Sequence, residues 1–214
     1  MYIKKATLAI IEELKQLYPD ALCSLDYGTD FELLFAVRLS AQCTDARVNL
    51  VTPALFARFP TLEDYAQADP KEVGKYIHSC GFYNAKAQDL VTCAQQLLSR
   101  HDGKVPDTME DLTALAGIGR KTANLILGDI YKHPSYVCDT HCIRITGRLG
   151  ITDGSKDPLQ VERQLRKALP PAESTDFCHR MVLFGRDTCT ARTAKCEVCA
   201  LRPYCKMGKK LKID

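Results

Sequence analysis

A lysine that follows a glycine-rich turn is the first candidate for chemistry in this sequence. Residues 112–124 have the pattern of a helix end, a tight turn on Gly117 and Gly119, and a second helix that begins at Arg120. Because glycine has no Cβ, its backbone can turn sharply and approach another surface closely. The amides of such a turn and of the helix behind it favour an anion, and a DNA phosphate fits that site.

Lys121 would lie in the first turn of this second helix. The positive end of the helix dipole and the neighbouring Arg120 both disfavour a protonated ammonium there. A lysine in such a place can act as a nucleophile. An ordinary turn between two helices, with a solvated lysine behind it, has the same residue pattern. This stretch alone therefore leaves both interpretations open.

Four of the eleven cysteines stand close together near the C-terminus, spaced C-x6-C-x2-C-x5-C: Cys189, Cys196, Cys199 and Cys205. Four thiolates in so short a segment can close around one metal centre, either an iron–sulfur cluster or zinc. Free buried thiols are the alternative. With every ligand position taken by protein, such a centre would be structural, and it would fold a segment that has few apolar residues.

The cysteine segment is also basic. Between residues 186 and 212 eight Lys or Arg stand against two acids, and the basic residues are Arg186, Arg192, Lys195, Arg202, Lys206, Lys209, Lys210 and Lys212. Such a region suits phosphates, although a solvated terminus has the same composition. The other seven cysteines are scattered singly, and we expect small core residues at Cys23, Cys43, Cys80, Cys93, Cys138, Cys142 and Cys178.

Helical periodicity accounts for nearly all of the chain, and no convincing run alternates with the period of a strand. We therefore predict an all-α protein without internal repeats. Capping residues mark the expected helix starts, at Thr29, Thr61, Asp69, Thr108, Asp139 and Asp157. We also expect the helix from Ala46 to stop near Val51, and a new helix to begin at Pro53.

The composition is that of an ordinary globular protein. The chain has 214 residues, of which 46% are hydrophobic and 26% charged, enough for one large or two small domains. Its net charge of +3 is too small to indicate nucleic-acid binding by itself. Neither a membrane-spanning run nor a signal peptide is apparent, and we expect a soluble cytoplasmic protein, associated with the nucleoid if the source is bacterial.

Five stretches of this chain resemble the endonuclease III family, the iron–sulfur branch of the helix-hairpin-helix DNA glycosylases. They occur in the family's order: LSAQCTD at 39–45, GFYNAKA at 81–87, LAGIGRKTAN at 115–124, VCDTHCIRITGRLG at 137–150 and the cysteine spacing at 189–205. The resemblance implies two helical domains flanking a DNA-binding cleft, a helical-barrel domain over residues 23–133 and an iron–sulfur domain from residues 1–22 and 134–214. It also implies a [4Fe–4S] cluster in preference to zinc.

The family's functional residues transfer position by position. The resemblance implies that Lys121 is the nucleophile and that Asp139 is its carboxylate partner. Gln42 and Phe82 fall where the family inserts side chains into the duplex. The other DNA contacts are expected at the hairpin and in the cysteine segment, at Gly117, Ile118, Gly119, Arg120, Arg192 and Lys195.

The function implied is that of a bifunctional DNA glycosylase and abasic-site lyase of base excision repair, acting as a monomer on duplex DNA with damaged bases or abasic sites. Lys121 favours the branch that removes oxidised pyrimidines, because the adenine-removing relatives lack this lysine. Asp139 can also be explained as a simple helix cap. A non-catalytic DNA-binding module and a zinc-stabilised interaction protein would both keep the glycines and the cysteines.

Three residues depart from the family's pattern. Ala116 stands where proline is common, which should loosen the turn slightly. Phe82 replaces a more usual leucine and enlarges the expected wedge. Cys138 replaces a small apolar residue, which would place an oxidisable thiol near Asp139.

Overall fold

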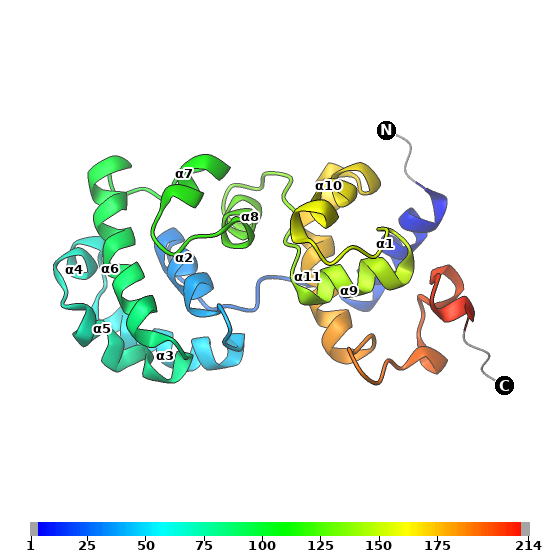
Figure 1. The fold of residues 1–214 in the computed structure, drawn as a ribbon, viewed down its shortest axis with the longest axis horizontal. Coiled ribbons are helices and arrows are strands. Elements are labelled where there is room, and N and C mark those ends of the chain that lie inside the picture. Colours follow the sequence, from blue (N-terminus) through cyan, green and yellow to red (C-terminus); the bar gives the residue numbers. More distant parts are fainter. Residues whose placement is uncertain (1–3, 211–214) are drawn as a thin grey trace. The chain divides into compact units, whose positions relative to one another are not determined.

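The computed structural model describes residues 4–210, which form α-helices, short 3-10 helices and connecting turns with no strand among them. The all-α prediction is confirmed. The chain divides into two compact units, one of residues 24–131 and one of residues 1–23 with 132–214 (Figure 1). The sequence analysis predicted the boundaries between the two domains after residues 22 and 133. Lys212 of the basic segment lies outside the described residues.

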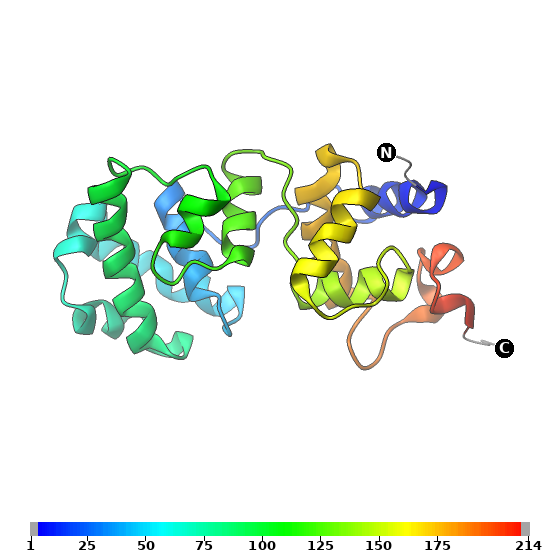
Figure 2. The same cartoon turned by 45° about the horizontal axis from the view of Figure 1, so that its top comes forward.

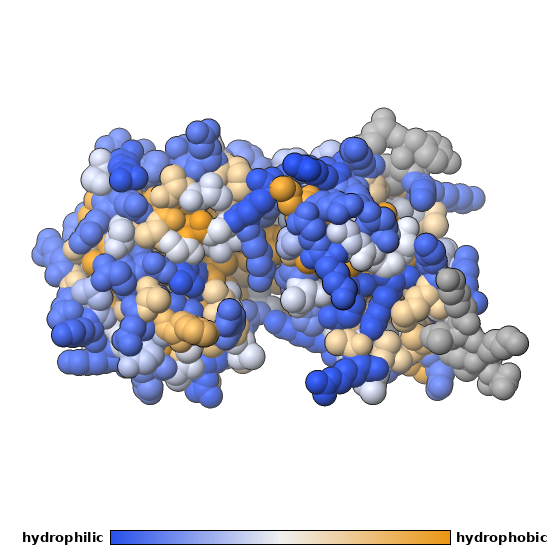
Figure 3. All heavy atoms as spheres, in the orientation of Figure 1, coloured by the Kyte–Doolittle hydropathy of each residue, from blue (hydrophilic) through white to orange (hydrophobic). Residues whose placement is uncertain are grey.

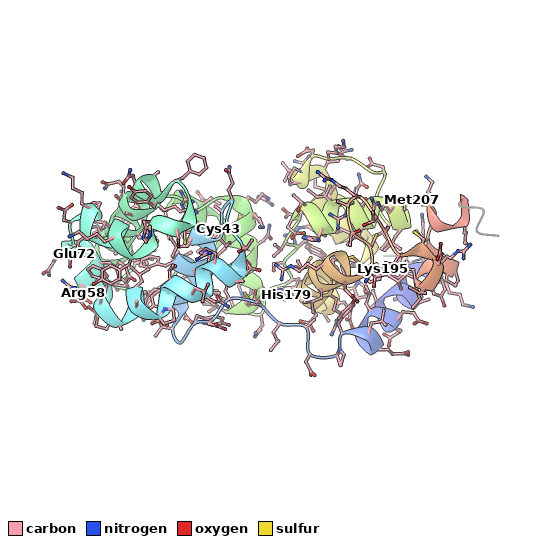
Figure 4. The ribbon with its side chains drawn as sticks, turned by 90° about the horizontal axis from the view of Figure 1, so that it is seen from below. Cys43, Arg58, Glu72, His179, Lys195 and Met207 are labelled. Atoms are coloured by element: carbon pink, nitrogen blue, oxygen red, sulfur yellow. The ribbon has the colours of Figure 1, made fainter. Side chains whose placement is uncertain are left out.

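The continuous unit is built around one long helix, α6. This helix contacts α2, α4 and α5, which lie along it in Figures 1 and 2. An ion pair of 2.6 Å between Arg58 and Glu72 links α3 to α5 at the surface (Figure 4). The helices of this unit are α2 (Asp30–Leu39), α3 (Asp45–Arg58), α4 (Leu62–Gln67), α5 (Pro70–Ile77), α6 (Tyr83–Arg100), α7 (Met109–Ala114) and α8 (Arg120–Asp129).

The other unit packs α11 against both α1 and α9. Its helices are α1 (Lys5–Leu17), α9 (Thr140–Leu149), α10 (Pro158–Ala168) and α11 (Ser174–Asp187). Between α11 and residue 210, the regular structure consists of short 3-10 helices, η3 (Cys196–Val198), η4 (Arg202–Tyr204) and η5 (Gly208–Lys210). With so little regular structure, this segment depends on other contacts for its shape.

The capping residues begin their helices as predicted. Side chains accept a first-turn backbone N–H at Thr29, Thr61, Asp69, Thr108, Asp139 and Asp157. The expected restart at Pro53 is wrong, because α3 is one helix with the proline inside it. Proline removes a single helical hydrogen bond. The buried face formed by Val48, Thr52 and Leu55 continues through it and holds the helix together.

None of the eleven cysteines forms a disulfide. Among the seven scattered ones, the core prediction is confirmed for Cys80, Cys93, Cys138, Cys142 and Cys178. It is wrong for Cys23 and Cys43, which are only half-buried because they lie in connecting turns.

The surface is mainly hydrophilic. Figure 3 shows polar side chains over most of the visible face of each unit, with smaller apolar patches between them. Within residues 4–210, no helix is long and apolar enough to cross a membrane.

Candidate functional site

The turn between α7 and α8 is held against the rest of its unit at Gly117. Gly117 has a φ of +72°, in the left-handed region that favours glycine. A Cβ at this position would stand 2.5 Å from Nε of Arg38 and 2.6 Å from Oδ2 of Asp89. Those two side chains form an ion pair in which Arg38 Nε and Nη2 donate to Asp89 Oδ2 at 2.8 and 2.5 Å. Both the backbone and the packing therefore require glycine here.

Gly119 lies in a different environment. Its φ of −98° is accessible to any residue, and a Cβ here would meet no atom within 4 Å. Gly119 is the N-cap of α8 and gives the first turn no side-chain cap. Nothing in residues 4–210 explains a glycine here, whereas close approach of an outside group would. The first amides of a helix without such a cap favour an anion.

Lys121 follows directly in the first turn of α8, where it is exposed. The opposite face of this helix packs into the unit through Ala123, Ile126 and Leu127. The packing fixes the helix, and the lysine amine is left accessible to a ligand bound at the turn.

The two expected wedge residues lie in turns of the same unit. Gln42 has a φ of +54° and Phe82 a φ of +49°, both in the left-handed region. Both side chains are exposed, and Phe82 keeps 72% of its surface accessible to solvent. Strained backbone of this kind costs of order 1–3 kcal/mol and clusters at ligand-binding sites. The enlarged apolar wedge expected at Phe82 is therefore presented to solvent on a constrained turn.

Asp139 lies in the other unit, at the N-terminus of α9. Its Oδ1 accepts the backbone N–H of Cys142 at 2.7 Å, so the capping role is real. Burial lowers the pKa of the nearby His141, and the charge of Asp139 opposes that shift. The cap holds the Asp139 carboxylate in one place, which suits a catalytic group as well as a structural one.

The four C-terminal cysteines line one cavity, together with Arg148 and Lys195. Burial raises the pKa of the Cys199 thiol, and the other three thiols add to that shift. The Cys199 sulfur is therefore within electrostatic reach of the other three. No group of three or more His, Cys, Asp or Glu in the described part of the chain is arranged to hold a metal ion.

Comparisons with protein families and with known proteins give matches over most of this chain. The sequence matches the HhH-GPD superfamily of base excision DNA repair proteins over residues 35–171. It is 42% identical to endonuclease III of Synechocystis, a match that covers 94% of this chain and 92% of the relative. With endonuclease III of Escherichia coli it shares 36% identity over 98% of this chain and 99% of the relative.

The chain belongs to the endonuclease III family. It is a base excision repair enzyme, a DNA glycosylase and abasic-site lyase, and the sequence predictions of family and enzyme class are confirmed.

Two solved structures show the same fold. A trapped endonuclease III–DNA covalent intermediate aligns with a TM-score of 0.91 at 38% identity, covering 98% of this chain and 99% of that one. A non-covalent endonuclease III–DNA complex aligns with a TM-score of 0.92, covering 98% of each chain. The fold of this chain is therefore that of the endonuclease III family.

The departure from the endonuclease III pattern at Ala116 has a structural explanation. Its backbone N–H donates to Oε1 of Gln96 on α6 at 2.7 Å. Proline has no N–H and could not make this bond. Here a hydrogen bond anchors the turn where a pyrrolidine ring would otherwise stiffen it. Gln96, Arg38 and Asp89 escaped the sequence analysis, although Arg38 stands out as the one charge in the apolar stretch of residues 33–39.

The departure from the family pattern at Cys138 lies in the protein core. Cys138 is 8% exposed, and Cys138 and Cys178 both raise the pKa of the buried Cys142 thiol. The Cys138 thiol therefore belongs to a buried cluster of three thiols in the core.

Two arginines of α9, also missed, shape the cysteine segment. Arg148 Nη1 donates to the carbonyl of Thr190 at 2.7 Å and to Sγ of Cys189 at 3.4 Å, and its Nη2 donates to the carbonyl of Ala191 at 2.8 Å. Arg144 Nη2 donates to the carbonyl of Cys189 at 2.9 Å. Their spacing of one helical turn is the signal that could have revealed them.

The two basic residues expected to contact DNA lie on the surface of this segment. Arg192 and Lys195 are both exposed, and Lys195 is labelled in Figure 4. Nζ of Lys195 lies 3.8 Å from Oδ1 of Asp187, an exposed and therefore weak ion pair. Both cations can meet a phosphate without a large desolvation cost.

Proposed function

We propose that this enzyme removes oxidised pyrimidines from duplex DNA through Lys121 and then cleaves the abasic strand by β-elimination. The observation that carries the proposal is the position of Lys121, exposed in the first turn of α8 directly behind the anion-binding turn at Gly119. A phosphate on that turn brings the sugar of a flipped nucleotide to the amine. The covalent intermediate trapped for a related endonuclease III supports the same chemistry.

Binding comes before chemistry, because a base inside the stack is out of reach of any nucleophile. The amides at Gly119 hold one phosphate, and Arg192 and Lys195 hold others. Gln42 and Phe82, on their strained turns, occupy the space that the flipped nucleotide leaves. Extrusion costs a few kcal/mol and is easier for a damaged base, which supports selection of damaged over normal pyrimidines.

The reaction then needs a nucleophile and a carboxylate. The unprotonated amine of Lys121 attacks C1′, the bond from C1′ to the base breaks, and the base leaves with its electron pair and takes up a proton. Opening of the sugar gives a Schiff base. Removal of a proton at C2′ then expels the 3′ phosphate. Asp139, fixed by its cap on α9, stabilises the cationic sugar and carries protons.

We propose that Cys189, Cys196, Cys199 and Cys205 hold a [4Fe–4S] cluster. A single zinc ion draws its four sulfurs to about 2.3 Å, whereas a cluster of several irons spreads its thiolates further apart. The four thiols line one cavity, and membership of the endonuclease III family favours the cluster over zinc. Arg148 offers a donor to one sulfur, and the N–H of Gly208 donates to Sγ of Cys205 at 3.3 Å. The cluster would fold the segment that carries Arg192 and Lys195.

Metal analysis of the purified protein tests this assignment. We expect iron and inorganic sulfide at about four atoms of each per chain, with a brown colour. One zinc per chain in a colourless protein would contradict the cluster and leave a tetrathiolate zinc site in its place.

Borohydride trapping tests the proposed reaction. With duplex DNA that contains one abasic site, borohydride should reduce the Schiff base and leave a covalent protein–DNA adduct on a denaturing gel. Intact duplex of the same sequence is the control and should give no adduct. A protein that binds the abasic duplex but forms no adduct would be a binding module instead of a lyase.

The relatives named above are bacterial proteins. We accordingly place this enzyme in the cytoplasm, where it acts on the nucleoid as a monomer.

A further inference from the structure

Two cysteines stand next to the two strained wedge residues. Cys43 directly follows Gln42, and Cys80 lies two positions before Phe82. Both cysteines belong to the continuous unit, and Cys43 is labelled in Figure 4. Any change at these two thiols therefore acts on the backbone next to Gln42 and Phe82.

The turns that carry the two thiols lie close together, and the Cys43 side chain adds to the burial that raises the pKa of Cys80. The backbones of their turns are joined by a buried cation as well. Lys86, only 1% exposed, donates from Nζ to the carbonyl of Leu39 at 2.8 Å and to the carbonyl of Cys80 at 2.6 Å. The two turns therefore lie close together, and the buried Lys86 side chain holds their backbones in place.

Lys86 also offsets part of the penalty that burial places on the Cys80 thiolate. Burial lowers the pKa of Lys86, and the Cys43 and Cys80 thiols oppose that shift. Burial and Cys43 raise the pKa of Cys80 to about 11, and the charge of Lys86 counteracts them. A cation beside a thiol stabilises the thiolate, which is the reactive form.

The two thiols differ in access. Cys43 is half-buried, whereas Cys80 is 1% exposed. A small oxidant can therefore reach Cys43, and Cys80 is placed to react with Cys43 from inside. This combination of one reachable and one shielded thiol is that of an attacking and a resolving cysteine.

We propose that Cys43 and Cys80 are a modification site for hydroperoxides, at which a reversible disulfide joins the turn of Gln42 to the turn of Phe82. The thiolate of Cys43 attacks one peroxide oxygen, the O–O bond breaks, and a sulfenic acid and water form. The sulfur of Cys80 then attacks the Cys43 sulfur and expels a second water. Two thiols lose two electrons and two protons, and hydrogen peroxide is reduced to two waters.

The disulfide changes the wedge, a consequence that rests on the proposed role of Gln42 and Phe82. To form the disulfide, the two sulfurs must approach to about 2.05 Å, well inside non-bonded contact, so the two turns must shift. Both wedge residues are already held in left-handed conformations that allow little adjustment. A shift near 1 Å at such positions costs up to about a hundredfold in function, and we expect a loss of damaged-duplex affinity on the order of tenfold. Thiol reductants should restore it.

Peptide mapping tests the modification without reference to DNA. The full-length protein with its metal centre is exposed to stoichiometric hydrogen peroxide, and free thiols are then alkylated under denaturing conditions. We expect one peptide pair linked through Cys43 and Cys80, absent from Cys43→Ser and still present in Cys23→Ser, which removes the other half-buried scattered thiol. Cys43 and Cys80 recovered as alkylated thiols at that dose would overturn the proposal.

Duplex affinity of the same samples tests the consequence, with a fluorescent duplex that contains an abasic site. Peroxide should weaken binding by the wild type and leave Cys43→Ser unchanged, which separates this effect from damage to the metal centre. A linked peptide with unchanged affinity would overturn the effect on the wedge and keep the modification site. Loss of binding in both proteins would place the damage elsewhere and likewise overturn the effect on the wedge.

Discussion

Lys121→Ala is expected to abolish base release and strand cleavage together. Removal of a catalytic nucleophile lowers turnover by about 10⁴-fold or more, because the remaining residues cannot form the covalent intermediate. Lys121 is exposed and is not among the buried residues of α8, so the variant should unfold at the wild-type temperature. Affinity for an abasic duplex should fall by no more than about tenfold, because only one cation is lost.

Cleavage of a duplex with one oxidised pyrimidine, followed under single-turnover conditions, measures this effect. Lys75→Ala is the matched control, since Lys75 is also exposed and lies in the same unit. It should cleave as the wild type does. Residual cleavage by Lys121→Ala above a hundredth of the wild-type rate would assign the nucleophile to another residue.

Asp139→Asn tests the other half of the same mechanism and resolves the ambiguity of a capping carboxylate. Asparagine caps helices as well as aspartate does, so the bond to the N–H of Cys142 survives and thermal stability should hold. The charge is lost, and cleavage should slow by about 10²–10⁴-fold. A variant that unfolds at a lower temperature but cleaves at the wild-type rate would show that Asp139 acts only as a helix cap.

The sequence predicted the local features of this fold and missed those that depend on distant partners. The caps at Thr29 and Asp139 need only residues three positions apart, and both were found. The bond between Arg38 and Asp89 joins residues 51 positions apart, and that between Gln96 and Ala116 joins residues 20 apart. Spacing within one stretch carries no trace of such pairs, so the anchoring of the turn stayed hidden.

Local spacing likewise limited what could be predicted of the two hairpin glycines, Gly117 and Gly119. Their pattern indicated a tight turn that approaches a surface, and the turn is there. The sequence could not say that Gly117 faces the ion pair of Arg38 and Asp89 while Gly119 faces open space. Gly117 is therefore needed to form the turn, whereas Gly119 leaves room for a bound ligand.

Alanine substitutions should separate these two tasks. Gly117→Ala places a methyl group 2.5 Å from Arg38 Nε at a φ of +72°, so the ion pair must move and the backbone is strained. We expect a loss of about 2–3 kcal/mol in the free energy of unfolding, from about 1–2 kcal/mol of left-handed strain and the disturbed ion pair. Thermal unfolding should fall by roughly 5–10 °C, which scanning calorimetry measures.

Gly119→Ala is the matched variant, since its added methyl group meets no atom within 4 Å and its φ of −98° accepts alanine. Stability should change by about 1 kcal/mol or less, the cost of alanine at an N-cap. Affinity for an abasic duplex should still fall on the order of tenfold, because the methyl group keeps the phosphate from the amides. Wild-type affinity in Gly119→Ala would show that no phosphate binds at this turn. Wild-type stability in Gly117→Ala would show that the Arg38–Asp89 ion pair moves without a loss of stability.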